Sequence, residues 1–231
     1  MPDLTPLDAL KSFCSRNTED PRPYRHHPIR TTTHAFGVDG SALLCVPLAM
    51  LDDPAEITPV VIDDPWFIRK DMRRLIDRAK AKAGELHPLP AIPTKIPCKR
   101  CGGDGLSPVK AKCDECDANG EFVHGSHWYS CAHCDGDGMI ASSDPGAAKS
   151  TDTCQSCSGF GEPIGQPVQI GTSYMARLYL ARIAALPGAR IATPIGDVTE
   201  PIYFTCDFGD GVVMPYIYPK AIKPTHQEHA S

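Results

Sequence analysis

The chain has 231 residues with a formal net charge of −5, and 42% of its residues are apolar. This apolar content suffices for a hydrophobic core and excludes a chain that is disordered throughout. The sequence has no run of about 18 uncharged apolar residues, which excludes a membrane-spanning helix. Its start has no signal-peptide pattern, so we expect a cytoplasmic protein of one or two domains.

The N-terminal region predicts a short helix followed by strands. Apolar residues recur at helical spacing from Leu4 to Arg16, and residues 29–38 alternate as in a strand. Asp39-Gly40 is a typical hairpin turn, and it precedes a further predicted strand at residues 42–46.

A basic helix is predicted next. Asp64 and Pro65 fit the N-cap and first position of a helix that ends near Ala83, before Gly84. One face of this helix carries seven basic residues and only two acidic ones; the basic residues are Arg69, Lys70, Arg73, Arg74, Arg78, Lys80 and Lys82. Such a face is typical either of a solvated amphipathic helix or of a helix that contacts the phosphate backbone of DNA.

Eight of the eleven cysteines form four C-x-x-C pairs between residues 98 and 157. A C-x-x-C pair supplies two corners of a tetrahedron, so two pairs complete a four-cysteine site and four pairs predict two Zn²⁺ ions. The alternatives are a disulfide framework, which would require export, and a redox motif, which usually occurs once within a βαβ unit. The remaining cysteines are predicted to be small buried side chains: Cys14, Cys45 and Cys206.

The cysteine-rich segment is poor in core-forming residues. Residues 98–161 contain nine large apolar side chains, too few to offset the entropy of ordering the segment, whereas each structural zinc can supply about 10 kcal/mol or more. We therefore expect this segment to unfold without metal. Its five basic and nine acidic residues do not favour nucleic-acid binding. Because eight thiolates already fill two tetrahedra, the nearby histidines are predicted to face solvent: His124, His127 and His133.

Glycines follow the cysteine pairs at a fixed spacing. Gly103 and Gly105 follow Cys101, and glycine accepts the positive φ that lets the chain curl back toward the thiolates. The repeat C-x-x-C-x-G-x-G resembles the cysteine-rich zinc domain of DnaJ-type co-chaperones, although Ala118 replaces the first glycine of the second repeat. The resemblance implies that the outer pairs share one zinc and the inner pairs the other. Site 1 would be Cys98, Cys101, Cys154 and Cys157, and site 2 would be Cys113, Cys116, Cys131 and Cys134.

Proline-rich stems flank the cysteine-rich segment. Prolines at positions 88, 90, 93 and 97 predict an extended strut before it, and further prolines follow it. A strand is predicted at residues 168–170, and a helix from Thr172 to about Leu186, where Pro187-Gly188 ends it. The last predicted strands lie near residues 190–193, 201–208 and 212–218, with Asp210-Gly211 as a second hairpin turn.

The flanking regions resemble one domain of the bacterial DNA sliding clamp. Residues 37–43, 168–174 and 211–215 resemble the clamp's A-T-D-G-x-x-L hairpin, its I-x-x-x-Y-L segment and its V-M-P ending. The resemblance implies that Arg177 and Arg182 face DNA, and that a partner pocket includes Val213, Met214 and Pro215. The chain has one such domain where the clamp has several, so a ring would require several copies.

Together these patterns predict an α+β fold, in which a clamp-like helix-plus-antiparallel-sheet domain is interrupted by a small, zinc-stapled, turn-rich β insertion. The predicted domains are residues 1–51 with 163–219 (clamp-like), 52–97 (basic helix and strut), 98–162 (zinc domain) and 220–231 (flexible tail).

We expect a non-enzymatic scaffold, because the sequence has no P-loop, G-x-S-x-G or H-E-x-x-H motif. Its expected partners are duplex DNA and replication proteins, protein clients of the zinc domain, or further copies of itself. The alternative is a DnaJ-like co-chaperone that binds unfolded proteins without a J domain.

Overall fold

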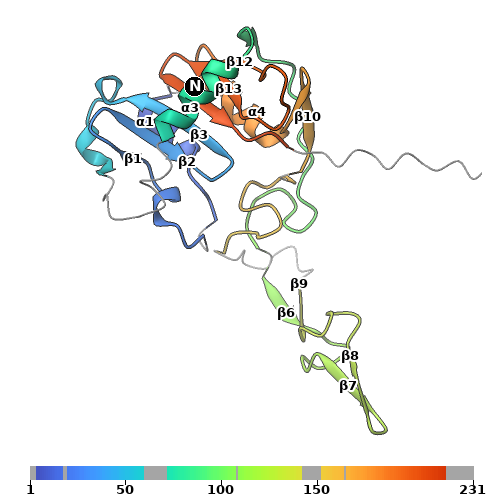
Figure 1. Ribbon diagram of the computed structural model, residues 1–231. Helices are drawn as coiled ribbons and strands as arrows, with labels where there is room; N and C mark the ends of the chain where they lie inside the picture. The colour runs from blue at the N-terminus through green and yellow to red at the C-terminus, as the bar shows by residue number, and fades with distance from the viewer. Residues whose placement is uncertain are drawn as a thin grey trace, which may run out of the picture. The chain divides into compact units, whose positions relative to one another are not determined.

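The computed structural model describes residues 4–17, 20–59, 72–107, 109–141, 152–163 and 165–216. The chain forms two compact units (Figure 1). The first comprises residues 1–15, 20–94 and 164–231, and the second comprises residues 16–19 and 95–163. The fold is α+β, as the sequence predicts. The predicted tail and the start of the predicted basic helix lie outside the described residues.

One eight-stranded sheet dominates the first unit, in the order β4-β1-β2-β3-β14-β13-β12-β5. The strands are β1 (Ile29–Arg30), β2 (His34–Val38), β3 (Ala42–Pro47), β4 (Thr58–Pro59), β5 (His87–Pro88), β12 (Arg190–Ala192), β13 (Ile202–Cys206) and β14 (Gly209–Val213). β4 runs parallel to β1, and the other pairs are antiparallel. Because β3 pairs with β14, the N-terminal and C-terminal parts of the chain share one sheet.

Helices cover both faces of this sheet: α1 (Pro6–Ser12), α3 (Met72–Lys82) and α4 (Arg177–Ala184). Ile76 of α3 packs in one core cluster with Tyr203. Phe13, at the end of α1, stacks on Phe204 with ring centroids 5.7 Å apart. Since neighbouring residues of a strand point to opposite faces, α1 and α3 lie on opposite sides of the sheet. The guanidinium of Arg182 in α4 lies 4.8 Å from the Phe13 ring centroid, which puts α4 on the α1 side.

The first unit contains further short elements. β10 (Pro167–Ile170) and β11 (Ser173–Ala176) form a separate hairpin. Among the described residues, the 3₁₀ helix η1 (Pro23–Arg25) precedes β1, and two more, η2 (Leu48–Met50) and η3 (Pro54–Glu56), lie between β3 and β4. In the part of the chain that the structure describes, no helix is long and apolar enough to cross a membrane.

Two predicted elements of the first unit are wrong in extent. The strand predicted over residues 29–38 is two antiparallel strands, β1 and β2, because the chain turns back at Thr31, whose N–H donates to the carbonyl of His34 at 2.8 Å. The helix predicted from Thr172 begins only at Arg177, because residues 173–176 pair with β10.

The second predicted hairpin turn is also misplaced. Asp210 and Gly211 lie within β14, and the turn between β13 and β14 falls at Asp207 and Phe208. A side chain at position 211 would collide with the ring of Phe204. This glycine therefore serves the packing of a strand rather than a turn.

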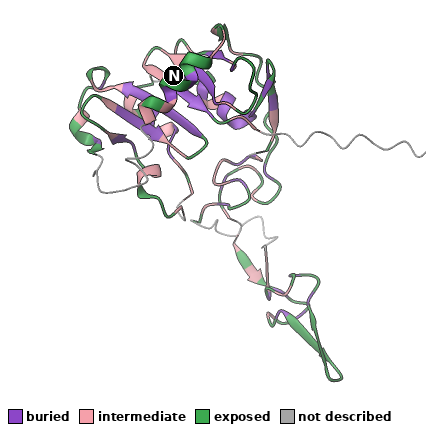
Figure 2. Ribbon diagram, in the orientation of Figure 1, coloured by how far each residue is buried: buried purple, intermediate pink, exposed green. Residues whose placement is uncertain are grey.

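The second unit contains little regular structure (Figure 2). β6 (Lys110–Lys112) pairs with β9 (Met139–Ala141), and β7 (Glu121–His124) pairs with β8 (His127–Ser130). Its two buried clusters consist of cysteines, with Ile140 packed against one of them. The unit therefore depends on its thiols for a core.

Candidate metal centres

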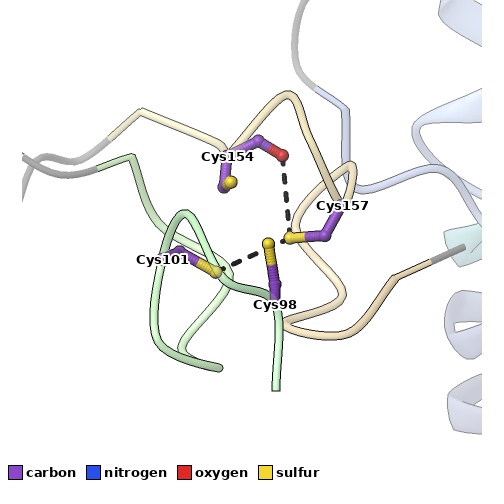
Figure 3. A group of neighbouring side chains, drawn as sticks. All are labelled: Cys98, Cys101, Cys154 and Cys157. Carbon is purple, nitrogen blue, oxygen red and sulfur yellow. Dashed lines mark hydrogen bonds between the residues drawn. The ribbon is translucent and has the colours of Figure 1, made fainter. Parts of the chain in front are cut away.

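The eight paired cysteines form two groups of four in the second unit. Site 1 is Cys98, Cys101, Cys154 and Cys157 (Figure 3), and site 2 is Cys113, Cys116, Cys131 and Cys134. Within each group the sulfur atoms lie within 4.8 Å of one another. The first and fourth cysteine pairs form one group, and the second and third pairs form the other. These are the ligand sets that the resemblance to the DnaJ-type domain implies.

The distances between sulfur atoms fit four-coordinate zinc. The Sγ atoms lie 3.7 Å apart in Cys101 and Cys157, 3.8 Å apart in Cys113 and Cys131, and 3.7 Å apart in Cys116 and Cys134. A tetrahedron with Zn–S bonds of about 2.3 Å has edges of about 3.8 Å. A disulfide would require about 2.05 Å, and all these cysteines are free thiols. The donor set and its spacing therefore match two Zn²⁺ ions.

The last glycine of each repeat hydrogen-bonds a sulfur atom. The backbone N–H groups of Gly105, Gly120, Gly138 and Gly161 donate to the second cysteine of their own pairs at 3.2–3.3 Å. A hydrogen bond to the charged form of a group favours that form. These N–H groups therefore stabilise the thiolates that zinc requires.

Reciprocal backbone hydrogen bonds join the two pairs of each site. In site 1, Cys98 N–H donates to the Gly161 carbonyl at 2.9 Å, and Cys154 N–H donates to the Gly105 carbonyl at 2.8 Å. The same exchange in site 2 joins Cys113 to Gly138 at 3.0 Å and Cys131 to Gly120 at 2.7 Å. A Cβ on any of these four glycines would overlap a carbonyl oxygen of the partner pair. The second glycine of the repeat is thus required by the pairing itself.

Ala118 keeps the backbone conformation of the glycine that it replaces. Its φ is +64°, and the equivalent glycines of the other repeats, Gly103, Gly136 and Gly159, also have positive φ. A left-handed conformation costs a non-glycine residue about 1–2 kcal/mol. Site 2 therefore keeps the backbone turns of site 1, but at this position of the repeat it holds a non-glycine residue in the left-handed region.

The four thiols of each site lie too close together for all of them to ionise without a bound cation. Burial and the neighbouring thiols raise the pKa of Cys116 and Cys157 to about 12. Burial also raises the pKa of Cys98, but hydrogen bonds with the backbone of Cys101 and Arg100 lower it more, to about 7. Four adjacent thiols therefore do not all ionise by themselves, and Zn²⁺ supplies the two positive charges that a four-thiolate site requires.

The histidines near the sites are not part of either cysteine group. His124, His127 and His133 are exposed, as predicted. Among the remaining thiols, Cys14 and Cys45 are buried, which raises the pKa of each to about 11, and Cys206 is partly exposed. The first two are therefore packed, un-ionised thiols, whereas Cys206, also predicted to be buried, is only partly buried.

Most of the described basic residues predicted to face DNA form ion pairs. Arg73 forms a bidentate pair with Asp210 at 2.6 and 2.9 Å. Arg78 and Lys82 pair with Glu200 at 3.3 and 2.5 Å. Arg74 and Lys80 are exposed on α3, and Arg69 and Lys70 lie outside the described residues.

The side chains of the two arginines of α4 are largely buried. Arg177 is 9% exposed, and its Nε donates to the carbonyl of Pro93 at 2.6 Å. The Arg182 guanidinium pairs with Asp39 at 2.5 Å and donates to the Ser12 carbonyl. DNA contact by these residues stays a prediction, and their burial counts against it.

The predicted partner pocket falls on the end of β14. Val213 is fully buried in the sheet, Pro215 is half-buried and Met214 is 44% exposed. Met214 N–H donates to the Ser41 carbonyl at 2.7 Å, which extends the pairing of β14 with β3. A pocket role for these residues stays a prediction.

Sequence reasoning missed an exposed apolar hairpin beside site 2. Strands β7 and β8 present four large apolar side chains to solvent: Phe122, Val123, Trp128 and Tyr129. The signal in the sequence is a pair of apolar dipeptides placed symmetrically about Gly125 and Ser126. Such a pattern predicts a hairpin but does not show whether its side chains are covered.

Comparison of the chain with protein-family models, curated proteins and solved structures finds no match. The resemblance to the DnaJ-type domain therefore rests on the two cysteine groups and their repeated glycines. The comparisons support neither that family nor the sliding clamp.

Proposed function

We propose that the protein is a non-enzymatic zinc-binding scaffold whose second unit is a protein-interaction module. The observation that carries this proposal is the closed geometry of the two sites. Four cysteine ligands leave no open position for water or substrate, which is the arrangement of structural rather than catalytic zinc. The apolar hairpin held by site 2 supplies a surface for a partner.

Zinc counting tests the metal part of this proposal. Native mass spectrometry of the purified protein should find two zinc ions per chain, and it also gives the oligomeric state. Chelation should then abolish the hydrogen-exchange protection of residues 98–161, because their core consists of metal ligands. A metal-free protein, or a second unit that keeps its protection after chelation, would contradict the proposal.

Association with DNA or replication proteins is a finer form of this proposal. It rests on the clamp resemblance and on the basic side chains that α3 exposes, among them Arg74 and Lys80. Titration with duplex DNA across a salt series tests it, since phosphate contacts weaken as salt rises. Lys80→Glu should reduce the affinity. A chain that does not bind duplex DNA even at low salt excludes this form.

Binding of unfolded proteins is the second candidate function. The exposed hairpin favours it, because apolar side chains in solvent can cover the apolar segments of a client. The test is whether the zinc-loaded protein suppresses the aggregation of a thermally unfolded client enzyme. A Trp128→Thr variant should suppress aggregation less than the unmodified chain, and equal aggregation with and without the unmodified chain excludes this function.

A further inference from the structure

Every residue of the β7–β8 hairpin, residues 121–130, is exposed (Figure 2). Phe122, Val123, Trp128 and Tyr129 are 41, 59, 71 and 53% exposed. Residues 98–161 contain only nine large apolar side chains, and these four are among them. The hairpin alone therefore exposes nearly half of the large apolar side chains of this segment to solvent. Apolar clusters of this kind mark interaction sites.

The strand register divides these side chains between two faces. Val123 pairs with Trp128, and Phe122 pairs with Tyr129. Since side chains alternate along a strand, Glu121, Val123, Trp128 and Ser130 share one face, which we call the Trp128 face. The opposite face carries Phe122 and Tyr129 with two histidines. The Trp128 face therefore combines an open indole, an aliphatic side chain and one carboxylate.

The charge around the hairpin is strongly negative. Residues 113–138 contain six carboxylates and no lysine or arginine; the acids are Asp114, Glu115, Asp117, Glu121, Asp135 and Asp137. A zinc ion held by four thiolates adds a charge of about −2. The hairpin is joined to site 2 at its base, where Cys131 N–H donates to the Gly120 carbonyl at 2.7 Å. The apolar side chains thus lie in an acidic setting.

This charge selects among possible occupants. Nucleic acid and anionic lipid are repelled, and two copies of the hairpin repel each other. A cationic group is attracted over distances of about a Debye length and, once close, can stack on an aromatic face. Of the candidate ligands, a positively charged polypeptide is the one that suits both the charge and the apolar area.

We propose that the Trp128 face binds an extended, cationic segment of a partner protein. A lysine or arginine of that segment stacks on the Trp128 indole while Glu121 offsets its charge, and a neighbouring apolar side chain covers Val123. The inference rests on the proposed function, because it names the partner chemistry of the same module. The occupant is defined by its chemistry: basic and apolar side chains that face the hairpin together.

A synthetic peptide of repeating Lys-Lys-Leu-Leu is a suitable probe, because in an extended chain every second residue faces the same side, which presents lysine and leucine together. Trp66→Phe leaves Trp128 as the only tryptophan, so its fluorescence reports this face. Titration of the peptide into the zinc-loaded protein should shift the Trp128 emission to shorter wavelength and saturate, and the affinity should fall as salt rises. The same peptide with glutamate in place of lysine should not bind.

Three substitutions test the face itself, with the anisotropy of a labelled peptide as readout. Trp128→Thr and Glu121→Gln should each weaken binding about fivefold or more, whereas Trp128→Phe should retain most of it. Phe122→Thr, on the opposite face of the same strands, is the matched control and should leave the affinity within about twofold. The zinc content of each variant shows whether site 2 remains intact. If Trp128→Thr loses zinc, the peptide affinity of Glu121→Gln tests the Trp128 face in its place.

The inference is overturned if Phe122→Thr weakens peptide binding as much as Trp128→Thr does, or if Glu121→Gln leaves the affinity unchanged. It is also overturned if the glutamate peptide or duplex DNA binds as tightly as the lysine peptide. A protein with two zinc ions that does not bind the lysine peptide overturns this inference alone. A protein without zinc overturns the proposed function as well.

Discussion

At the scale of single residues, Ala118 is a strained position in an otherwise repeated structure. Its φ is +64°, and the glycine at the same position of each of the three other repeats also has a positive φ. Ala118→Gly should therefore stabilise the zinc-loaded second unit by about 0.5–1 kcal/mol, the relief of strain less the entropy that glycine adds to the unfolded chain. Thermal unfolding followed through the amides of residues 113–141 measures this change.

The matched control for Ala118→Gly is Ala111→Gly in strand β6 of the same unit. Glycine within a strand is destabilising by about 0.5–1 kcal/mol relative to alanine. The two substitutions should therefore shift the unfolding temperature in opposite directions. A lower unfolding temperature for Ala118→Gly would show that the left-handed conformation is not strained.

Arg182 forms a largely buried ion pair in the first unit. Its side chain is 9% exposed and pairs with the side chain of Asp39, which is 5% exposed. The Asp39 carboxylate also accepts the backbone N–H groups of Ser41 and Ala42 in the β2–β3 turn. Arg182→Met leaves the Asp39 carboxylate buried without its cation, which should destabilise the unit by about 3 kcal/mol or more. Chemical denaturation followed by circular dichroism gives the value.

Lys80→Met is the control for Arg182→Met, because Lys80 is exposed on α3 and should tolerate the change within about 0.5 kcal/mol. If Arg182→Met is equally mild, the buried pair contributes little to stability. In that case the guanidinium would be more available to an external phosphate than its surroundings suggest.

Residue roles could be predicted from the sequence where they depend on local spacing. The zinc ligands follow from C-x-x-C, since two thiols on one tight turn need only a second such turn. The role of Arg182 could not be predicted, because its partner Asp39 is 143 residues away in the sequence. Its basic character suggested solvent or DNA, whereas tertiary structure places it against an acid.

At the scale of elements, the approach of α1 to the sheet depends on Gly37 in β2. A Cβ at this position would overlap the carbonyl oxygen of Leu10 in α1. Gly37→Ala should push the helix from the sheet, weaken the stacking of Phe13 on Phe204, and destabilise the first unit by about 1–3 kcal/mol.

Denaturant unfolding of Gly37→Ala beside Gly84→Ala separates this packing effect from the general effect of replacing glycine. The Cβ of Gly84→Ala would lie 3.4 Å from the Thr193 carbonyl, close to an ordinary contact distance. That variant should be neutral or more stable by up to about 1 kcal/mol. Equal stability of the two variants would mean that α1 does not need its close contact with β2.

The dipeptide Asp-Gly occurs at two places in the sheet, and only one of them forms the turn that the sequence predicts. Asp39-Gly40 makes the predicted turn between β2 and β3, with Gly40 at φ +103°. Asp210-Gly211 is part of β14, where Gly211 lies against β3 and the Phe204 ring. Turn propensity is local, but the choice between turn and strand at residue 211 is made by packing that the sequence does not display.

At the scale of the whole molecule, the chain leaves and re-enters the first unit at adjacent points. Gln166 donates to the Thr94 carbonyl at 3.3 Å, and Arg177 donates to the Pro93 carbonyl at 2.6 Å. The prolines before Cys98 predict an extended stem. They do not predict that the start of this stem contacts the segment that follows the last cysteine pair. Adjacent stems let the second unit fold or unfold without separating the strands of the sheet.

The two zinc sites should likewise be independent of each other. Each site obtains all its ligands and all its reciprocal glycine hydrogen bonds from its own two cysteine pairs. Cys134→Ser should therefore leave one zinc per chain and remove the exchange protection of β7 and β8, while site 1 and the eight-stranded sheet keep theirs. Cys157→Ser should also leave one zinc per chain, but with the hairpin still protected.

Native mass spectrometry and hydrogen exchange on the same samples distinguish independent sites from coupled ones. Cys206→Ser is the control and should retain both zinc ions, because Cys206 belongs to neither cysteine group. Loss of both ions on either ligand substitution would mean that the sites fold as one cooperative unit. Loss of one ion with the hairpin intact after Cys134→Ser would mean that the hairpin does not depend on site 2. An isolated two-stranded hairpin is marginally stable in water, so zinc at its base is what we expect to keep Trp128 in place.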